Sequence, residues 1–114
     1  MRYAMLICGD PASWDDTPAE DQAAAMTATY TWFERWVQAG KIADGGAELA
    51  PVQTAKSIRV GQVTDGPFVE AKEVIGGFVL LNADSMDEAL KIAATWPTAD
   101  RPDVVIEVRP VVEH

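Results

Sequence analysis

The sequence is poor in the residues on which many catalytic and metal sites depend. It holds one cysteine, Cys8, and one histidine, His114, in 114 residues. A lone cysteine forms no internal disulfide, and the two residues cannot supply a cysteine- or histidine-based metal site. Cys8 lies in an apolar run and is expected to pack as a small hydrophobe rather than act as a nucleophile. Most histidine-based chemistry within one chain is excluded, and we expect no metal and no cofactor.

Basic residues and long apolar runs are also scarce. Nine lysines and arginines stand against eighteen acidic residues, which gives a formal charge of -9. Nucleic acids and anionic membrane surfaces are bound by clustered basic residues, so neither is an expected partner. No apolar stretch approaches the roughly 18 residues that span a bilayer. The first apolar run has no signal-peptide cleavage site after it, and we expect a cytoplasmic protein.

The residues that are present predict one α+β domain over 1–114. The first helix has Thr17 as a possible N-cap, Pro18 at its first position and Gly40 as a left-handed stop, and Ser85 caps the second helix. The segment 10–16 is expected to be a polar loop, in which Trp14 either covers the edge of the core or lines a pocket. Hydrophobic periodicity predicts helices at 17–39 and 86–96, and strands at 3–8, 42–50, 57–63, 77–83 and 104–112.

This order of elements favours a ferredoxin-like split βαβ fold, an antiparallel sheet with both helices on one face. The opposite face would then expose apolar side chains, namely Phe78 or Val79 together with Val105 and Val111. An exposed apolar sheet face marks an association surface. We therefore predict a homodimer in which two sheets pack face to face as a dimeric α+β barrel.

The segment after the predicted strand 57–63 has the most unusual composition. Asp65 begins an Asp-Gly-Pro turn, where it acts either as a turn-former or as a general base. Glu70, Lys72 and Glu73 follow within a few residues. They form either a solvated charge cluster or a site in which Lys72 holds an anionic substrate and a carboxylate takes its proton.

Aromatic residues on the first helix provide the apolar part of a possible site. Trp32 and Trp36 lie beside the main apolar stripe and either pack in the core or line a pocket. Tyr30 is a core residue or a phenolic hydrogen-bond donor. Glu107 and Arg109 share one strand face and are expected to need partners in a dimer, with Arg109 also a candidate ligand contact.

Several motifs together make the chain resemble the DGPF branch of the YCII-related family. They are the opening Arg-Tyr-Ala-Met-Leu-Ile at 2–7, the Asp-Gly-Pro-Phe turn at 65–68, the charged stretch at 70–73, the Gly-Gly-Phe at 76–78, the Asp-Glu-Ala at 87–89 and the closing 107–111. The resemblance implies soluble bacterial proteins with the dimeric α+β barrel, some of them linked to extracytoplasmic-function sigma factors. In the wider family a His-Asp pair is the proposed catalytic centre. Thr29 and Tyr30 stand where we would expect that histidine.

Three functional hypotheses follow. The first is a small-molecule lyase or isomerase that works by proton transfer with Asp65, Glu70 and Lys72. The second is a non-enzymatic ligand-binding or accessory protein, with a sigma factor as a possible partner, and the third is a purely structural dimer. Any ligand would be small and anionic or aromatic, in a pocket between the loop 65–73 and the aromatic side of the first helix.

Overall fold

The computed structural model describes residues 1–67 and 74–114. The predicted charged residues Glu70, Lys72 and Glu73 lie outside the described residues. A 3₁₀ turn occupies Val52–Thr54. The helices and strands, in chain order, are β1 (Arg2–Gly9), α1 (Pro11–Asp15), α2 (Ala19–Gln38), β2 (Ile42–Glu48), β3 (Lys56–Arg59), β4 (Gln62–Asp65), β5 (Val74–Asn82), α3 (Met86–Ala93) and β6 (Val104–Pro110).

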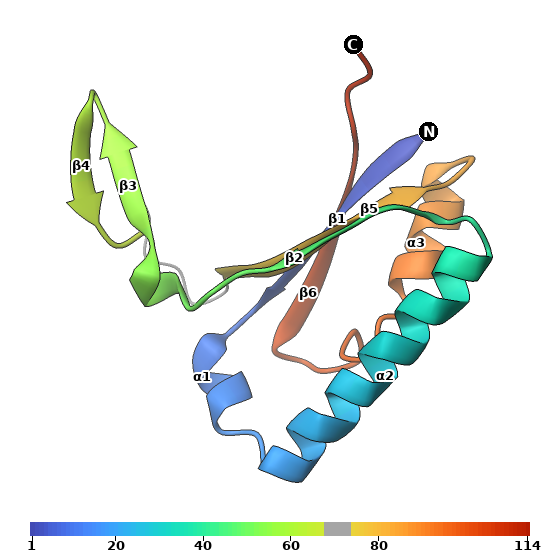
Figure 1. Ribbon diagram of the computed structural model, residues 1–114, viewed down its shortest axis with the longest axis horizontal. Coiled ribbons are helices and arrows are strands. Elements are labelled where there is room, and N and C mark those ends of the chain that lie inside the picture. Colours follow the sequence, from blue (N-terminus) through green and yellow to red (C-terminus); the bar gives the residue numbers. More distant parts are fainter. Residues whose placement is uncertain (68–73) are drawn as a thin grey trace.

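Four strands form one antiparallel sheet in the order β2-β5-β1-β6. The two central strands, β1 and β5, are adjacent in space although most of the chain separates them. Helices α2 and α3 both lie on one side of this sheet (Figure 1). The predicted ferredoxin-like split βαβ arrangement is therefore confirmed.

The core lies between the sheet and these two helices. Met5 of β1 is fully buried and stands opposite Val79 of β5 and Val108 of β6. Trp32 of α2 and Ile92 of α3 close the core from the helix side. Alternate residues of each strand point to opposite faces, so the apolar residues at every second position of β1 and β5 meet the helices.

The other face of the sheet carries the residues in between. Leu6 lies between Phe78 of β5 and Glu107 of β6, and Ala4 lies opposite Arg109. Phe78, rather than Val79, is thus the residue on this face, because Val79 is buried under the helices. We refer to the surface formed by Ala4, Leu6, Phe78, Leu80, Val105, Glu107 and Arg109 as the open face.

The predicted strand 57–63 is wrong: this part of the chain is a hairpin, β3–β4, that forms a sheet of its own. Val60 and Gly61 make the turn, with φ of 50° and 75°. Two successive positive φ values define a type I′ hairpin turn, which asparagine or glycine normally occupies. The valine masked the turn, because the alternation of side chains that begins at Ser57 continues through Val60.

The structure also corrects the predicted loop at 10–16 and the predicted start of the first long helix. The segment 10–16 contains the short helix α1, whose N-cap Asp10 accepts a hydrogen bond from the Ala12 amide at 3.0 Å. Helix α2 begins with Pro18 at its N-cap position, so Thr17 does not cap it and instead donates to the Ser13 carbonyl at 2.9 Å. Gly40 does take the left-handed conformation after α2 (φ 73°).

Helix α3 starts as predicted. The Ser85 hydroxyl accepts a hydrogen bond from the Glu88 amide at 3.2 Å, which satisfies a backbone donor of the first turn. The regular helix ends at Ala93, earlier than the predicted 96, and turns carry the chain to β6. No helix among the described residues is long and apolar enough to cross a membrane.

Candidate binding cleft

A cleft of about 710 Å³ lies on the helix side of the sheet, between α1, the middle of α2 and the ends of the central strands. Helix α2 contributes Ala25, Met26, Thr29, Tyr30 and Phe33. Positions three and four apart lie on one face of a helix, so these residues form a continuous wall. Tyr30 is 65% exposed and stands at the mouth of the cleft.

Glycine pairs shape the floor of the cleft, where β2 approaches β5. A β-carbon on Gly46 would overlap the Phe78 carbonyl group, and one on Gly77 would lie 3.0 Å from the Ala47 carbonyl oxygen. The pairing register of β2 shifts on both sides of Asp44, so the strand is bulged here. The glycines therefore allow two backbones to meet closely at the floor of the cleft.

An aromatic cluster supports the inner wall. The rings of Phe33 and Trp96 both line the cleft and meet edge to face, with centroids 6.0 Å apart. Trp32 stands behind them, 5.0 Å from Phe33 and 4.9 Å from Trp96, again edge to face. Such T-shaped pairs are favoured by the ring quadrupoles, and they fix the orientation of the two rings that face the cleft.

A fixed cation lies at the α1 end. The Arg101 guanidinium donates to Asp103 through Nε at 3.2 Å and through Nη2 at 3.4 Å, and Nη2 also donates to Thr17 at 3.2 Å. It also stands over the Trp14 ring, with 5.8 Å between Cζ and the ring centroid. The hydrogen bond from Arg101 lowers the pKa of the Asp103 carboxyl. Asp103 is thus held as an anion that orients the arginine.

Carboxylates complete the polar part of the cleft. Asp10, Asp15 and Glu48 all line it. Asp10 is half-buried at the end of β1, and Oδ1 accepts a hydrogen bond from the Ala12 amide. The cleft therefore combines an aromatic wall, a phenol, one oriented cation and carboxylates. Within residues 1–67 and 74–114, no three His, Cys, Asp or Glu side chains are grouped to hold a metal ion.

Only one of the predicted site residues within the described chain, Tyr30, lines this cleft. Trp32 is 4% exposed and belongs to the core, and its indole donates to the Thr95 hydroxyl at 2.9 Å. Trp36 donates to the same hydroxyl at 3.2 Å and lies under Arg35. Of the two alternatives, core packing is therefore the arrangement found for Trp32.

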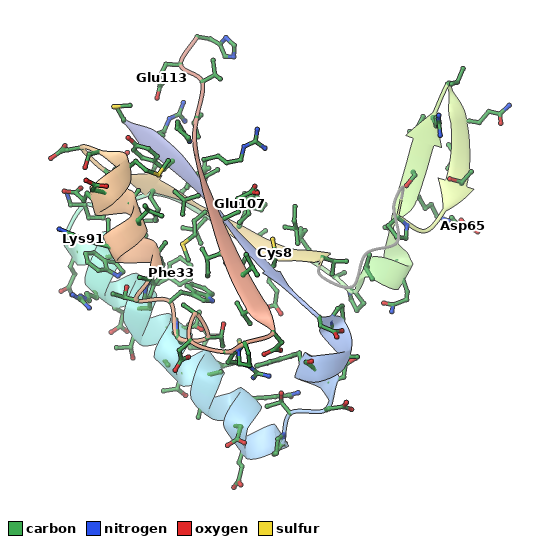
Figure 2. All side chains as sticks on the ribbon, turned by 180° about the vertical axis from the view of Figure 1, so that it is seen from behind. Cys8, Phe33, Asp65, Lys91, Glu107 and Glu113 are labelled. Carbon is green, nitrogen blue, oxygen red and sulfur yellow. The ribbon has the colours of Figure 1, made fainter. Side chains whose placement is uncertain are left out.

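The remaining predicted residues lie elsewhere. Asp65 is 89% exposed on the hairpin and forms an ion pair with Lys56. Figure 2 shows it well away from Phe33 on α2. Arg109 is on the open face, on the opposite side of the sheet from the cleft. The cleft is not the predicted pocket, because Asp65 does not border it and its helix wall is formed by residues other than Trp32 and Trp36.

Sequence reasoning missed Arg101 and Asp103, and it identified Trp14 only as a residue that covers the core edge or lines a pocket. Arg101 reaches Thr17, which is distant in sequence, and no local pattern indicates that contact. A tryptophan in a polar segment was the one usable signal, because such a residue needs an apolar surface to cover.

The fold and cleft place the chain in the class of α+β proteins with a ferredoxin-like sheet and two covering helices. The YCII-related domain matches residues 1–114, so the chain belongs to the YCII-related family. An uncharacterised protein of Rhizobium meliloti strain 1021 is 34% identical over 115 residues, which cover 97% of this chain and 92% of that protein.

A solved structure shows the same fold. It is 5-chloro-2-hydroxyhydroquinone dehydrochlorinase from Burkholderia phenoliruptrix AC1100, in complex with 2,5-dihydroxybenzoquinone. The TM-score is 0.62 over 100% of this chain and 96% of that chain, with 16% sequence identity. At this identity the likeness concerns the arrangement of the backbone.

Proposed function

We propose that this protein binds a small oxygenated aromatic molecule in the cleft and acts on it as a lyase, by proton transfer. The observation that carries this proposal is the oriented Arg101 at one end of an aromatic-walled cleft of about 710 Å³. Sites for small organic ligands typically enclose about 300–1,000 Å³ and combine apolar walls with a few polar groups.

The cleft favours a flat ring with oxygen substituents. Phe33 and Trp96 offer ring edges and faces against which an aromatic ligand packs. Arg101 uses Nε and Nη2 for Asp103 and Thr17, and Nη1 has no hydrogen-bond partner within the part of the chain that the structure describes. A phenolate or enolate oxygen is a suitable acceptor for that group, and the Tyr30 phenol supplies a second donor.

Elimination is the lyase reaction that these groups can support without a cofactor. A carboxylate takes the proton of a ring hydroxyl and returns it to the chlorine-bearing carbon, while the oxyanion's electron pair forms a C=O bond. Loss of the proton of a second hydroxyl then forms a second C=O bond and shifts the ring double bond, and chloride departs with its bonding pair. Asp10 is our candidate base, because it is half-buried in the cleft and Oδ2 is not used for capping. Arg101 would stabilise the oxyanion that develops on the ring.

The structural neighbour supports this choice among lyase reactions. Its name describes a dehydrochlorinase, an enzyme that removes hydrogen chloride, and its ligand is a small oxygenated ring. The neighbour suggests the chemical class, and the cleft of this chain has the walls and charges for a ligand of that class. A role for Glu70 and Lys72 stays a prediction.

Ligand binding without catalysis is the second candidate. The one histidine of the sequence is His114, so no imidazole lines the cleft as an acid or base. Thr29 and Tyr30 stand where the resemblance to the family leads us to expect the histidine. A sigma-factor partner stays a prediction to which we assign no surface.

Binding is tested by calorimetric titration with 2,5-dihydroxybenzoquinone. Ala25 lines the cleft, whereas the neighbouring Ala24 is exposed and does not. We expect Ala25→Phe to weaken binding by about tenfold or more and Ala24→Phe to leave it within about twofold. Equal effects of the two variants, or no binding by the unaltered protein, would contradict the proposed site.

Catalysis is tested by chloride release from 5-chloro-2-hydroxyhydroquinone. Asn caps a helix as well as Asp does, so Asp10→Asn keeps α1 capped while it removes the base. We expect the unaltered protein to release chloride, and Asp10→Asn to lose at least about 100-fold of that rate while it still binds the quinone. Binding without chloride release by the unaltered protein would favour the second candidate.

We also propose that two copies pair through the open face. Leu6 and Phe78 are neighbours at its centre, and Val105 is 46% exposed. Burial of this surface by a second sheet would remove apolar area from water, at about 25 cal/mol per Å². Sedimentation equilibrium should give a dimer of twice 12.3 kDa. Leu6→Asp should dissociate it, whereas a monomeric unaltered protein would refute the pairing.

A further inference from the structure

The β3–β4 hairpin stands apart from the rest of the chain. Among the described residues its strands pair only with each other, and it projects on the side of the sheet away from α2 and α3 (Figure 1). The radius of gyration is 15.4 Å. A compact chain of this length would have about 13 Å. An isolated two-stranded hairpin is marginally stable in water, so this arrangement calls for a further contact.

The end of the hairpin is apolar. Ile58 and Val63 are directly opposite each other, and their exposed fractions are 74% and 62%. Val60 in the turn is 94% exposed. Single exposed apolar side chains are ordinary, but three on one projecting end form a patch of the kind that marks an interaction surface.

Val60 also adopts a strained backbone conformation. Its φ of 50° makes it the one non-glycine residue with positive φ among residues 1–67 and 74–114. A β-branched residue is a genuine outlier in this region, and such strain is concentrated at functional positions. An exposed valine contributes nothing there to the stability of the isolated chain. Its side chain is therefore explained best by a contact that the isolated chain does not make.

A second copy of the chain is the partner that fits. The hairpin projects from the side of the sheet that carries the open face, so a copy packed on that face comes within its reach (Figure 1). Residues 56–65 hold Lys56, Arg59 and Asp65, a net formal charge of +1 in a chain of charge -9. The hairpin and the acidic remainder of a second copy are thus complementary in charge.

We propose that the β3–β4 hairpin is a dimerisation arm whose apolar end, Ile58, Val60 and Val63, docks on a second copy of the chain. This inference rests on the proposed pairing through the open face and adds a second contact to it. The arm would bury the exposed end, and the strain at Val60 would be offset by the interface.

The test measures the dimer dissociation constant by sedimentation equilibrium for two variants and a control. Val60→Asn creates an Asn-Gly turn, which favours the type I′ conformation, so it strengthens the hairpin while removing the apolar side chain. Ile58→Thr/Val63→Thr keeps β-branched residues in both strands but removes apolar surface. Gln62→Thr alters the opposite face of the hairpin and is the control.

We expect each of the first two variants to raise the dissociation constant by about tenfold or more, with the control within about twofold. A weakened dimer in Val60→Asn cannot be attributed to an unfolded hairpin. Unchanged dissociation constants in both variants would overturn the proposal that the hairpin is a dimerisation arm, even if two copies still pair through the open face. A dimer that Leu6→Asp leaves intact and the arm variants dissociate would support the arm while refuting the open face.

Discussion

Replacing Gly46 by alanine is expected to disrupt the pairing between β2 and β5. The β-carbon would overlap the Phe78 carbonyl oxygen and lie 2.7 Å from its carbonyl carbon. Gly46 also has φ of 67°, a conformation that alanine adopts only with strain. Gly40 is a matched control, because its φ is 73° and no atom lies within 4 Å of a β-carbon built there.

The expected losses of stability distinguish the cost of the left-handed conformation from the cost of the steric overlap. The left-handed conformation costs alanine about 1–2 kcal/mol at either position. At Gly46 the overlap is with backbone atoms, so β2 has to move and its hydrogen bonds to β5 weaken, at about 1 kcal/mol each. We therefore expect losses in unfolding free energy of about 1–2 kcal/mol for Gly40→Ala and about 3 kcal/mol or more for Gly46→Ala.

The assay is urea unfolding followed by circular dichroism, at one fixed protein concentration because dimerisation would shift the apparent stability. In thermal unfolding of the same variants, each kcal/mol of lost unfolding free energy should lower Tm by about 3–6 °C for a chain of this size. Losses of equal size for the two variants would refute the reasoning, since they would leave only the conformational cost and no close approach of β2 to Phe78.

Two further predictions concern polar contacts. Thr95→Val removes the hydroxyl that accepts from Trp32 and Trp36, which should cost about 1–3 kcal/mol in urea unfolding. Thr95→Ser should cost little, and equal effects would contradict this account. The hydrogen bond from Lys41 lowers the pKa of Glu88 below its ordinary 4.5, so its contribution to stability is present above that pH and is lost as the pH falls through the lowered pKa. The difference in unfolding free energy between the unaltered protein and Glu88→Gln should shrink below pH 4.5, and a pH-independent difference would contradict the ion pair.

Much of the fold could be predicted from local patterns. The first strand, the serine cap of α3 at Ser85 and the stop of α2 at Gly40 are all as expected. These features depend on residues within a turn or two of each other, where propensity and capping chemistry act. The hairpin could not be predicted, because Val60 occupies a turn position that its own side chain disfavours.

The candidate site was less accessible to sequence reasoning. The sequence pattern favoured a site at the charged residues around Asp65, because they are crowded together in the sequence. In the structure Asp65 is exposed on the hairpin. The oriented cation of the cleft, Arg101, is held by Thr17 from a distant part of the chain. Neither residue is distinctive by itself.

The sequence by itself determined the class of fold, the periodic faces of its helices and strands, and the family to which the chain belongs. The tertiary structure decided which faces meet: Trp14, Tyr30 and Arg101 converge on one cleft, whereas Arg109 falls on the opposite face of the sheet. The physical reason is that periodicity reports which side of an element is buried, through contacts a few residues apart. Convergence instead depends on strand order, register and the path of the loops, which are set by contacts between residues far apart in the chain.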